Sequence, residues 1–162
     1  MTHKSTFSEN DWKLLIQAPS IAGMYITLAS PSIGDSIKES MAIASKIADV
    51  AKGQSGGELV SEIVAEFKDF SSIRSAQPQF ESRDMDGMKS EALASLRSAA
   101  QAASSGTGAA DAAEYRQWVY DIAIAAANAA KEGDVLGIGG VRVNEAEEAA
   151  LADIASALGI SA

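Results

Sequence analysis

Hydrophobic residues recur along most of the chain at intervals of three and four positions, the spacing of one face of an α-helix. The clearest stripe lies in the segment 110–132. Its members are Tyr115, Trp118, Val119, Ile122, Ala126 and Ala129, with Ala123, Ile124 and Ala127 beside it. Polar residues are therefore confined to a narrow strip, and a helix of this kind is usually central in its bundle. We expect the other helices to enclose this one.

Capping and helix-breaking residues delimit the helices of the first half. Ser8 is the expected N-cap of the first helix, with Asp11 at its third position. Pro19 should kink or restart this helix, and the segment 30–32 should end it. A second helix is predicted over about 33–52. A third, shorter helix should follow Gly57 and bury its apolar residues, which are Leu59, Ile63, Val64 and Phe67.

The same signals delimit the second half. Residues 69–82 have no sustained period and predict a loop, and the serine- and glycine-rich segment 104–108 predicts a linker. Between them we expect a helix from about Asp84 or Asp86 to Ala103. After the central helix, Asn144 and Glu147 form the pattern of a capping box for a last helix, which Gly159 should end.

The fold predicted is all-α, one domain over 1–162 with about six helices around the segment 110–132. The 32 alanines support it, because alanine is the strongest helix former. A short sequence similarity between residues 43–52 and 122–131 leaves open an internal duplication, with two related three-helix halves at about 8–68 and 84–158.

Composition excludes several classes of protein. The 162 residues carry a net charge of −9, which argues against a duplex-binding module because phosphate contacts need clustered lysine and arginine. No cysteine and a single histidine, His3, leave few ways to build a metal or acid–base site. The uncharged stretch 14–34 includes Pro19 and Gly23 and predicts a buried helix, not a membrane span. We expect a cytoplasmic protein without nucleic-acid or membrane partners.

Two glycine-rich motifs resemble functional loops without their chemistry. The segment 53–57 matches G-x-S-x-G, but it follows a predicted helix, and no histidine comes after the serine. The loop 134–143 lacks the oxygen ligands of a calcium loop and the lysine of a phosphate loop. We therefore expect neither a metal ion nor a cofactor, and we interpret both segments as connectors between helices.

A few side chains are candidates for a binding site beside the 134–143 loop. They are Tyr115, Trp118, Tyr120, Asp121 and Arg142. Asp121 lies midway along the most apolar helix, so burial would require a partner such as Arg116 or Arg142. A structural ion pair is the favoured interpretation over a catalytic acid. The aromatics could line a pocket, although helical spacing is more typical of core residues. Glu62 and Glu66, four residues apart, predict a solvated face.

Two segments resemble a pattern found in small, uncharacterised, all-helical bacterial proteins. One is Trp12-Lys13-Leu14-Leu15-Ile16-Gln17-Ala18-Pro19, and the other runs from Ala129 through the glycine-rich loop to Glu147. The resemblance implies a helical fold and carries no activity.

For function, we expect a non-catalytic helical interaction or scaffold protein that self-associates into a homo-oligomer. The hypothesis rests on the absence of four sequence features: a set of metal-ligating residues, a nucleophile paired with a general base, a phosphate-binding loop and a cluster of basic residues. The alternative is a small-molecule-binding protein with a pocket between helices near the 134–143 loop. A carboxylate enzyme with Asp121 as its base ranks third.

Overall fold

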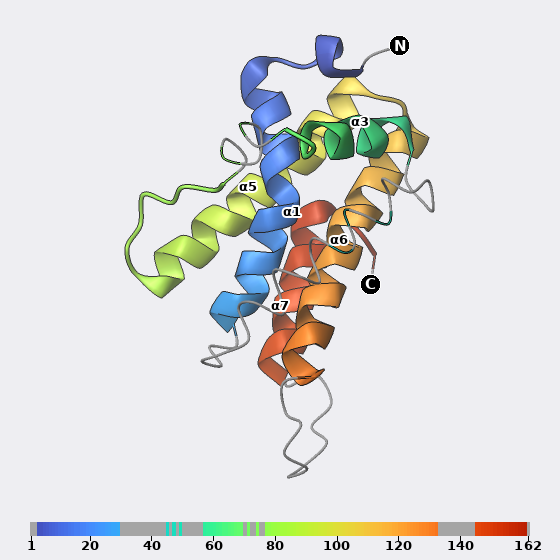
Figure 1. Ribbon diagram of the computed structural model, residues 1–162. Coiled ribbons are helices and arrows are strands. Elements are labelled where there is room, and N and C mark those ends of the chain that lie inside the picture. Colours follow the sequence, from blue (N-terminus) through green and yellow to red (C-terminus); the bar gives the residue numbers. More distant parts are fainter. Residues whose placement is uncertain are drawn as a thin grey trace.

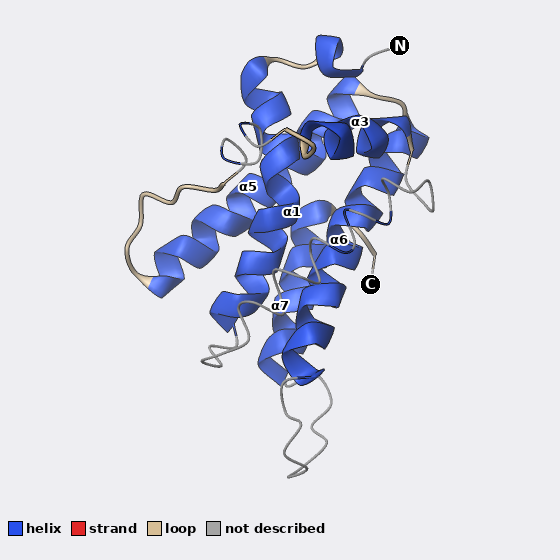
Figure 2. Cartoon of the chain, viewed as in Figure 1, coloured by secondary structure: helices blue, strands red, loops and turns tan. Residues whose placement is uncertain are grey.

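The computed structural model describes residues 3–29, 45, 47, 49, 57–69, 71, 74, 77–132 and 145–161. In this part of the chain all regular structure is helical (Figure 2). The elements are η1 (His3–Thr6), α1 (Glu9–Ala29), α3 (Glu58–Glu66), α5 (Met85–Gly106), α6 (Ala109–Glu132) and α7 (Glu145–Leu158). The five α-helices pack into a single bundle, which confirms the predicted all-α class. Most of the predicted helix 33–52 lies outside the described residues, and 45, 47 and 49 are helical.

Helix α6 is unbroken and contacts each of the other four helices, α1, α3, α5 and α7. Figure 1 shows α1, α6 and α7 running alongside one another, with α3 across one end and α5 crossing α1. The stripe predicted on α6 is buried from Tyr115 to Ala127. Its opposite side, including Glu114 and Gln117, is exposed. The arrangement agrees with the central place that the sequence predicts for this helix.

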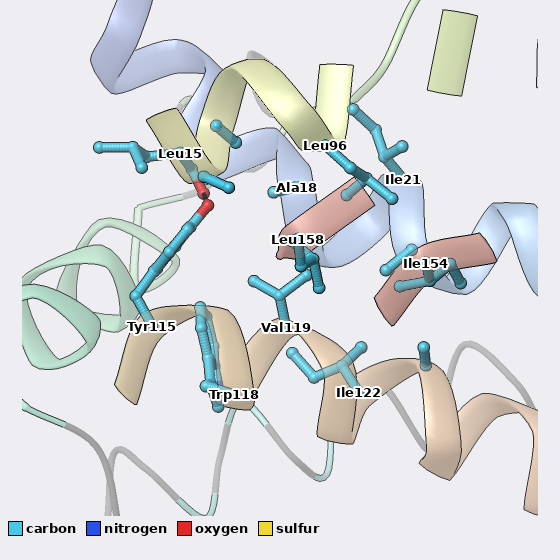
Figure 3. Close-up of a cluster of buried hydrophobic side chains, with 14 of the residues drawn as sticks. Leu15, Ala18, Ile21, Leu96, Tyr115, Trp118, Val119, Ile122, Ile154 and Leu158 are labelled. Atoms are coloured by element: carbon cyan, nitrogen blue, oxygen red, sulfur yellow. Dashed lines mark hydrogen bonds between the residues drawn. The ribbon is translucent and has the colours of Figure 1, made fainter. Parts of the chain in front are cut away.

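The core is built mainly from aliphatic side chains, and all five α-helices contribute to it; Figure 3 shows part of it. Each of these helices contributes residues at most 1% exposed, and from α1, α5, α6 and α7 they include Leu15, Ile21, Leu96, Val119, Ile122, Ile154 and Leu158. Burying each such side chain stabilises the fold by about 1.5–3 kcal/mol before conformational entropy is counted. Leu59, Ile63 and Val64 of α3 are also buried, as predicted, and Phe67 is half-buried.

The start of α1 follows the predicted cap, and of the two effects predicted for Pro19 the restart does not occur. The backbone N–H of Asp11 donates to the Ser8 hydroxyl oxygen at 3.1 Å, and that hydroxyl donates to the Asp11 carboxylate at 2.8 Å. The helix does not restart at Pro19 but continues to Ala29 as one element. Its last residue directly precedes the Ser30-Pro31 break that the sequence indicates.

Helix α5 begins where it was predicted and ends later. Asp84 is its N-cap, and the Asp84 carboxylate accepts from the Gly87 N–H at 3.0 Å. The predicted linker 104–108 is wrong in its first part, because the helix extends to Gly106. The Ser104 hydroxyl donates to the Ala100 carbonyl at 2.9 Å, so this serine bonds within the helix instead of breaking it.

Helix α7 ends at the predicted glycine. Gly159 has a φ of 72°, the left-handed conformation that favours glycine. The Ile160 N–H bonds to the Ala155 carbonyl at 2.9 Å, and the Gly159 N–H bonds to the Ser156 carbonyl at 3.2 Å. These two bonds form a Schellman motif, which satisfies carbonyls at the helix end. Among the described helices, none has the length and hydropathy needed to cross a membrane.

Candidate functional site

Tyr115, the first predicted site residue, lies in the core. Its side chain is 0% exposed, and its hydroxyl donates to the Leu15 carbonyl oxygen at 3.0 Å (Figure 3). Burial raises the pKa of Tyr115 above its usual value of 10. The phenol is therefore neutral at physiological pH and ties α6 to α1.

The two neighbouring aromatic candidates also pack with core residues. Trp118 is 5% exposed, and its ring centre lies 6.3 Å from that of Tyr115 with the ring planes inclined by 51°. Its indole N–H is buried and has no hydrogen-bond partner among the described residues. Tyr120 is half-buried against the same core. A role for these aromatics in binding stays a prediction.

Of the two charged candidates, Asp121 is the one that lies within the described residues. Asp121 is half-buried, and its carboxylate accepts from the Gln117 side-chain amide at 2.9 Å. Arg116 instead donates to the Ser104 hydroxyl of α5 and lies beside Gly159 of α7. In the described part of the chain the partner of Asp121 is thus an amide, and an ion pair with Arg142 stays a prediction. Arg142 and the 134–143 loop lie outside the described residues.

Glu62 and Glu66 hold the N-terminal turn η1 on α3. The Lys4 ammonium contacts the Glu66 carboxylate at 2.5 Å, and the Lys4 backbone N–H donates to Glu62 at 3.0 Å. The same ammonium lies 5.9 Å from the centre of the Trp12 ring. The predicted solvated face is thus only partly solvated: both carboxylates are half-buried, and both contact Lys4.

Asp111 supplies the N-terminal cap of α3 from the first turn of α6. Its carboxylate accepts from the Glu58 N–H at 3.0 Å and from the Thr107 hydroxyl at 3.3 Å. The N-cap of α3 is Gly57, which has no side chain to cap with, and a Cβ there would overlap the Asp111 carboxylate. Asp111 thus replaces the local cap that α3 lacks.

A hollow of about 420 Å³ lies between the start of α1 and the end of α5; we call it the α1–α5 hollow. Its lining residues on the α1 side are Thr6, Phe7, Asn10, Asp11 and Leu14, and on the α5 side Ser98, Gln101, Ala102, Ser105 and Gly106. The two sides are tied at one end, where the Thr6 hydroxyl donates to the Gly106 carbonyl at 3.0 Å. Gly106 lets Phe7 approach, because a Cβ there would overlap the ring.

The lining of the α1–α5 hollow combines hydrogen-bond donors and acceptors with apolar side chains. Asn10 and Gln101 carry amides, and Ser98 and Ser105 carry hydroxyls, each able to donate and accept. Leu14, Ala102 and Phe7 supply the apolar part. Asp11 is the one carboxylate in this lining and already accepts from Ser8. This chemistry suits a small polar ligand without negative charge.

The α1–α5 hollow could not be predicted from the sequence, because its lining residues come from two segments far apart in the chain. Hydrophobic periodicity identifies the buried face of a helix but does not show which helices pack together. A weak local signal existed in Asn10, Asp11 and Ser98, which are polar positions beside a half-buried leucine, Leu14. Within the described residues, no group of three or more histidine, aspartate or glutamate side chains is placed to hold a metal ion.

Comparison with known proteins identifies no relative. The chain matches no protein-family model, and neither the curated proteins nor the solved structures gave a match. The helical fold that the resemblance implies is confirmed, and membership of the bacterial group remains a prediction.

Proposed function

We propose that this protein is a non-catalytic binding protein whose ligand is a small, uncharged polar molecule held in the α1–α5 hollow. The observation that carries the proposal is the lining, which combines the amides of Asn10 and Gln101 and the hydroxyls of Ser98 and Ser105 with apolar side chains. Recognition by neutral amides and hydroxyls favours a ligand rich in hydroxyl or amide groups. The pocket that the sequence predicts near residues 134–143 lies outside the described residues and stays a separate prediction.

A non-catalytic role is supported by the way the carboxylates are used. Asp84 caps its own helix, Asp111 caps α3, and Glu91 accepts from the backbone N–H groups of Glu81 and Ser82. A hydrogen bond from the Ser82 side chain, together with these backbone bonds, keeps the pKa of Glu91 below its usual value. A carboxylate stabilised in its charged form is a weak base, whereas general acid–base catalysis needs a pKa near the working pH.

The proposal is tested by a thermal-shift and ligand-observed NMR screen of polyols, sugars and small amides. A ligand that binds the native state raises the melting temperature. The variant Ala102→Leu fills the hollow from its α5 side and should abolish the shift. Ala94→Leu is the matched control, since Ala94 is exposed on the same helix outside the hollow. Loss of the shift in both variants, or in neither, contradicts the assignment.

Self-association is the second candidate function, and the outer side of α7 favours it. Ala149, Ala152 and Ser156 are all exposed and lie on one face of the helix at intervals of three and four residues. Small side chains allow a second helix to approach closely, as alanine-rich contacts do. The neighbouring Glu145 and Glu148 place negative charge on this side, so association should strengthen as salt screens their repulsion.

Light scattering across a concentration series, at low and high salt, tests this candidate. A homo-oligomer should show a mass that rises with concentration and with salt. Ala152→Lys should prevent the rise, while Ala94→Lys, an exposed alanine of α5, should leave it unchanged. A monomer at every concentration and salt contradicts self-association and leaves the ligand proposal standing.

A further inference from the structure

A second hollow lies between α1 and the residues Arg74, Gln77 and Gln79, and the charge of its lining is opposite in sign to that of the whole protein. Its volume is about 380 Å³, and the residues around it are Lys13, Gln17, Arg74, Gln77 and Gln79. We call it the basic hollow. Two cations and three amides line it, and none of its lining residues is acidic. This is unexpected in a chain whose net charge is −9.

The two cations have no charged partner in the described part of the chain. Neither Lys13 nor Arg74 forms an ion pair there, in contrast to Lys4, which pairs with Glu66. A hydrogen bond joins the two sides of the hollow, because the Gln17 side-chain amide donates to the backbone carbonyl oxygen of Gln77 at 3.3 Å. Both cations thus line the same hollow, and in the described part of the chain no carboxylate neutralises them.

We infer that the basic hollow binds a small oxyanion with two negative charges, such as a phosphate ester or a short dicarboxylate. Arginine offers two parallel N–H donors that match a carboxylate or phosphate, and lysine adds a point charge. The amides of Gln77 and Gln79 supply further N–H donors at the rim. The site is separate from the α1–α5 hollow, since the two share no lining residue.

The chemistry also sets the strength of the interaction. Both cations are exposed, so each charge contact acts in water and contributes modestly. We therefore expect weak binding that falls as ionic strength rises, because salt screens exposed charges. Removing one cation should weaken binding roughly fivefold, and removing both should abolish saturation.

The test is a titration of the ¹⁵N-labelled full-length protein with inorganic phosphate and, separately, with succinate, at constant ionic strength set by chloride. We expect saturable shifts of the side-chain amide signals of Gln17, Gln77 and Gln79. Lys13→Gln and Arg74→Gln should weaken binding. The matched controls Lys68→Gln and Arg97→Gln, at exposed cations outside the hollow, should not.

The outcomes separate this inference from its alternatives. Saturation by phosphate alone assigns a phosphate-type ligand, and saturation by succinate alone assigns a dicarboxylate. Shifts that grow linearly with both anions, or that weaken equally in all four variants, overturn the inference. Ala102→Leu should leave the anion titration unchanged, so failure of the proposed function and failure of this inference are distinguishable.

Discussion

The hydroxyl of Tyr115 donates a hydrogen bond to the carbonyl oxygen of Leu15, the residue four positions before Pro19. In a regular helix that carbonyl accepts from the N–H of residue 19, which proline lacks. Helix α6 thus supplies from a buried phenol the bond that α1 cannot make for itself. Pro19 and Tyr115 are therefore coupled: the proline leaves the Leu15 carbonyl without its helical donor, and the tyrosine supplies that donor.

Tyr115→Phe should therefore destabilise the fold by about 1–3 kcal/mol, because it leaves a buried carbonyl without its donor. The control is a double-mutant cycle with Pro19→Ala, which restores a backbone N–H to residue 19. In the alanine background the same Tyr115→Phe change should cost about 1 kcal/mol less. Urea unfolding of the four proteins measures the coupling, and strictly additive costs contradict the relationship.

Asp111→Ala should cost about 0.5–2 kcal/mol, the usual loss for an N-cap, because the Glu58 N–H at the start of α3 loses its acceptor. Asp86→Ala is the matched control. Both aspartates lie in the first turn of a helix and favour its dipole, but Asp86 is exposed and caps no second helix. Equal losses of stability in the two variants contradict the capping role.

Alkaline pH should weaken the contact between Tyr25 of α1 and Asp153 of α7. The Tyr25 hydroxyl donates to the Asp153 carboxylate at 2.8 Å; burial, followed by this bond and the nearby charge, raises the pKa of Tyr25 from 10.0 to about 12. Its contribution to stability is complete below about pH 10. Between about pH 10 and 12 the unfolded state loses the proton first, so stability falls.

The measurement is the urea midpoint as a function of pH for the wild type and Tyr25→Phe. The wild type should lose its advantage over the variant between about pH 10 and 12. Tyr115, whose pKa burial also raises, is present in both proteins and cancels in the difference. Parallel curves through this range contradict the assignment to Tyr25.

Gly159→Ala should destabilise the protein by about 1–2 kcal/mol, because an L side chain at a φ of 72° is strained. Space is not the cause, since the added Cβ would meet the Arg116 guanidinium at an ordinary 3.8 Å. Gly159→Asn should cost less than Gly159→Ala, because asparagine tolerates the left-handed region. Thermal denaturation of both variants measures the two losses of stability. A larger loss for Gly159→Asn than for Gly159→Ala contradicts a conformational origin.

Features that depend on neighbouring residues could be predicted from the sequence, and features that depend on helix placement could not. The Ser8–Asp11 cap, the Asp84 cap and the Gly159 terminator each involve positions within a few residues of one another. The sequence also predicted the buried stripe of α6, because a period of three and four residues reports directly on a helix face.

Hydrogen bonds between different helices could not be predicted, because they depend on how the helices pack. The Tyr115–Leu15 and Asp111–Glu58 bonds join residues 100 and 53 positions apart, and no spacing rule relates them. The direction of Arg116 could not be predicted for the same reason, since only the fold brings its guanidinium to Ser104 of α5, while Asp121 accepts from Gln117. The prediction for Ser104 failed locally, because serine can bond to a carbonyl of its own helix.

Native-state hydrogen exchange followed by NMR tests most directly the central position of α6 in the bundle. Because α1, α3, α5 and α7 all cover this helix, the amides from Tyr115 to Ala127 should be among the slowest to exchange and should open only with global unfolding. Exchange of these amides as fast as those at the ends of α3, with an opening free energy well below that of unfolding, contradicts the architecture.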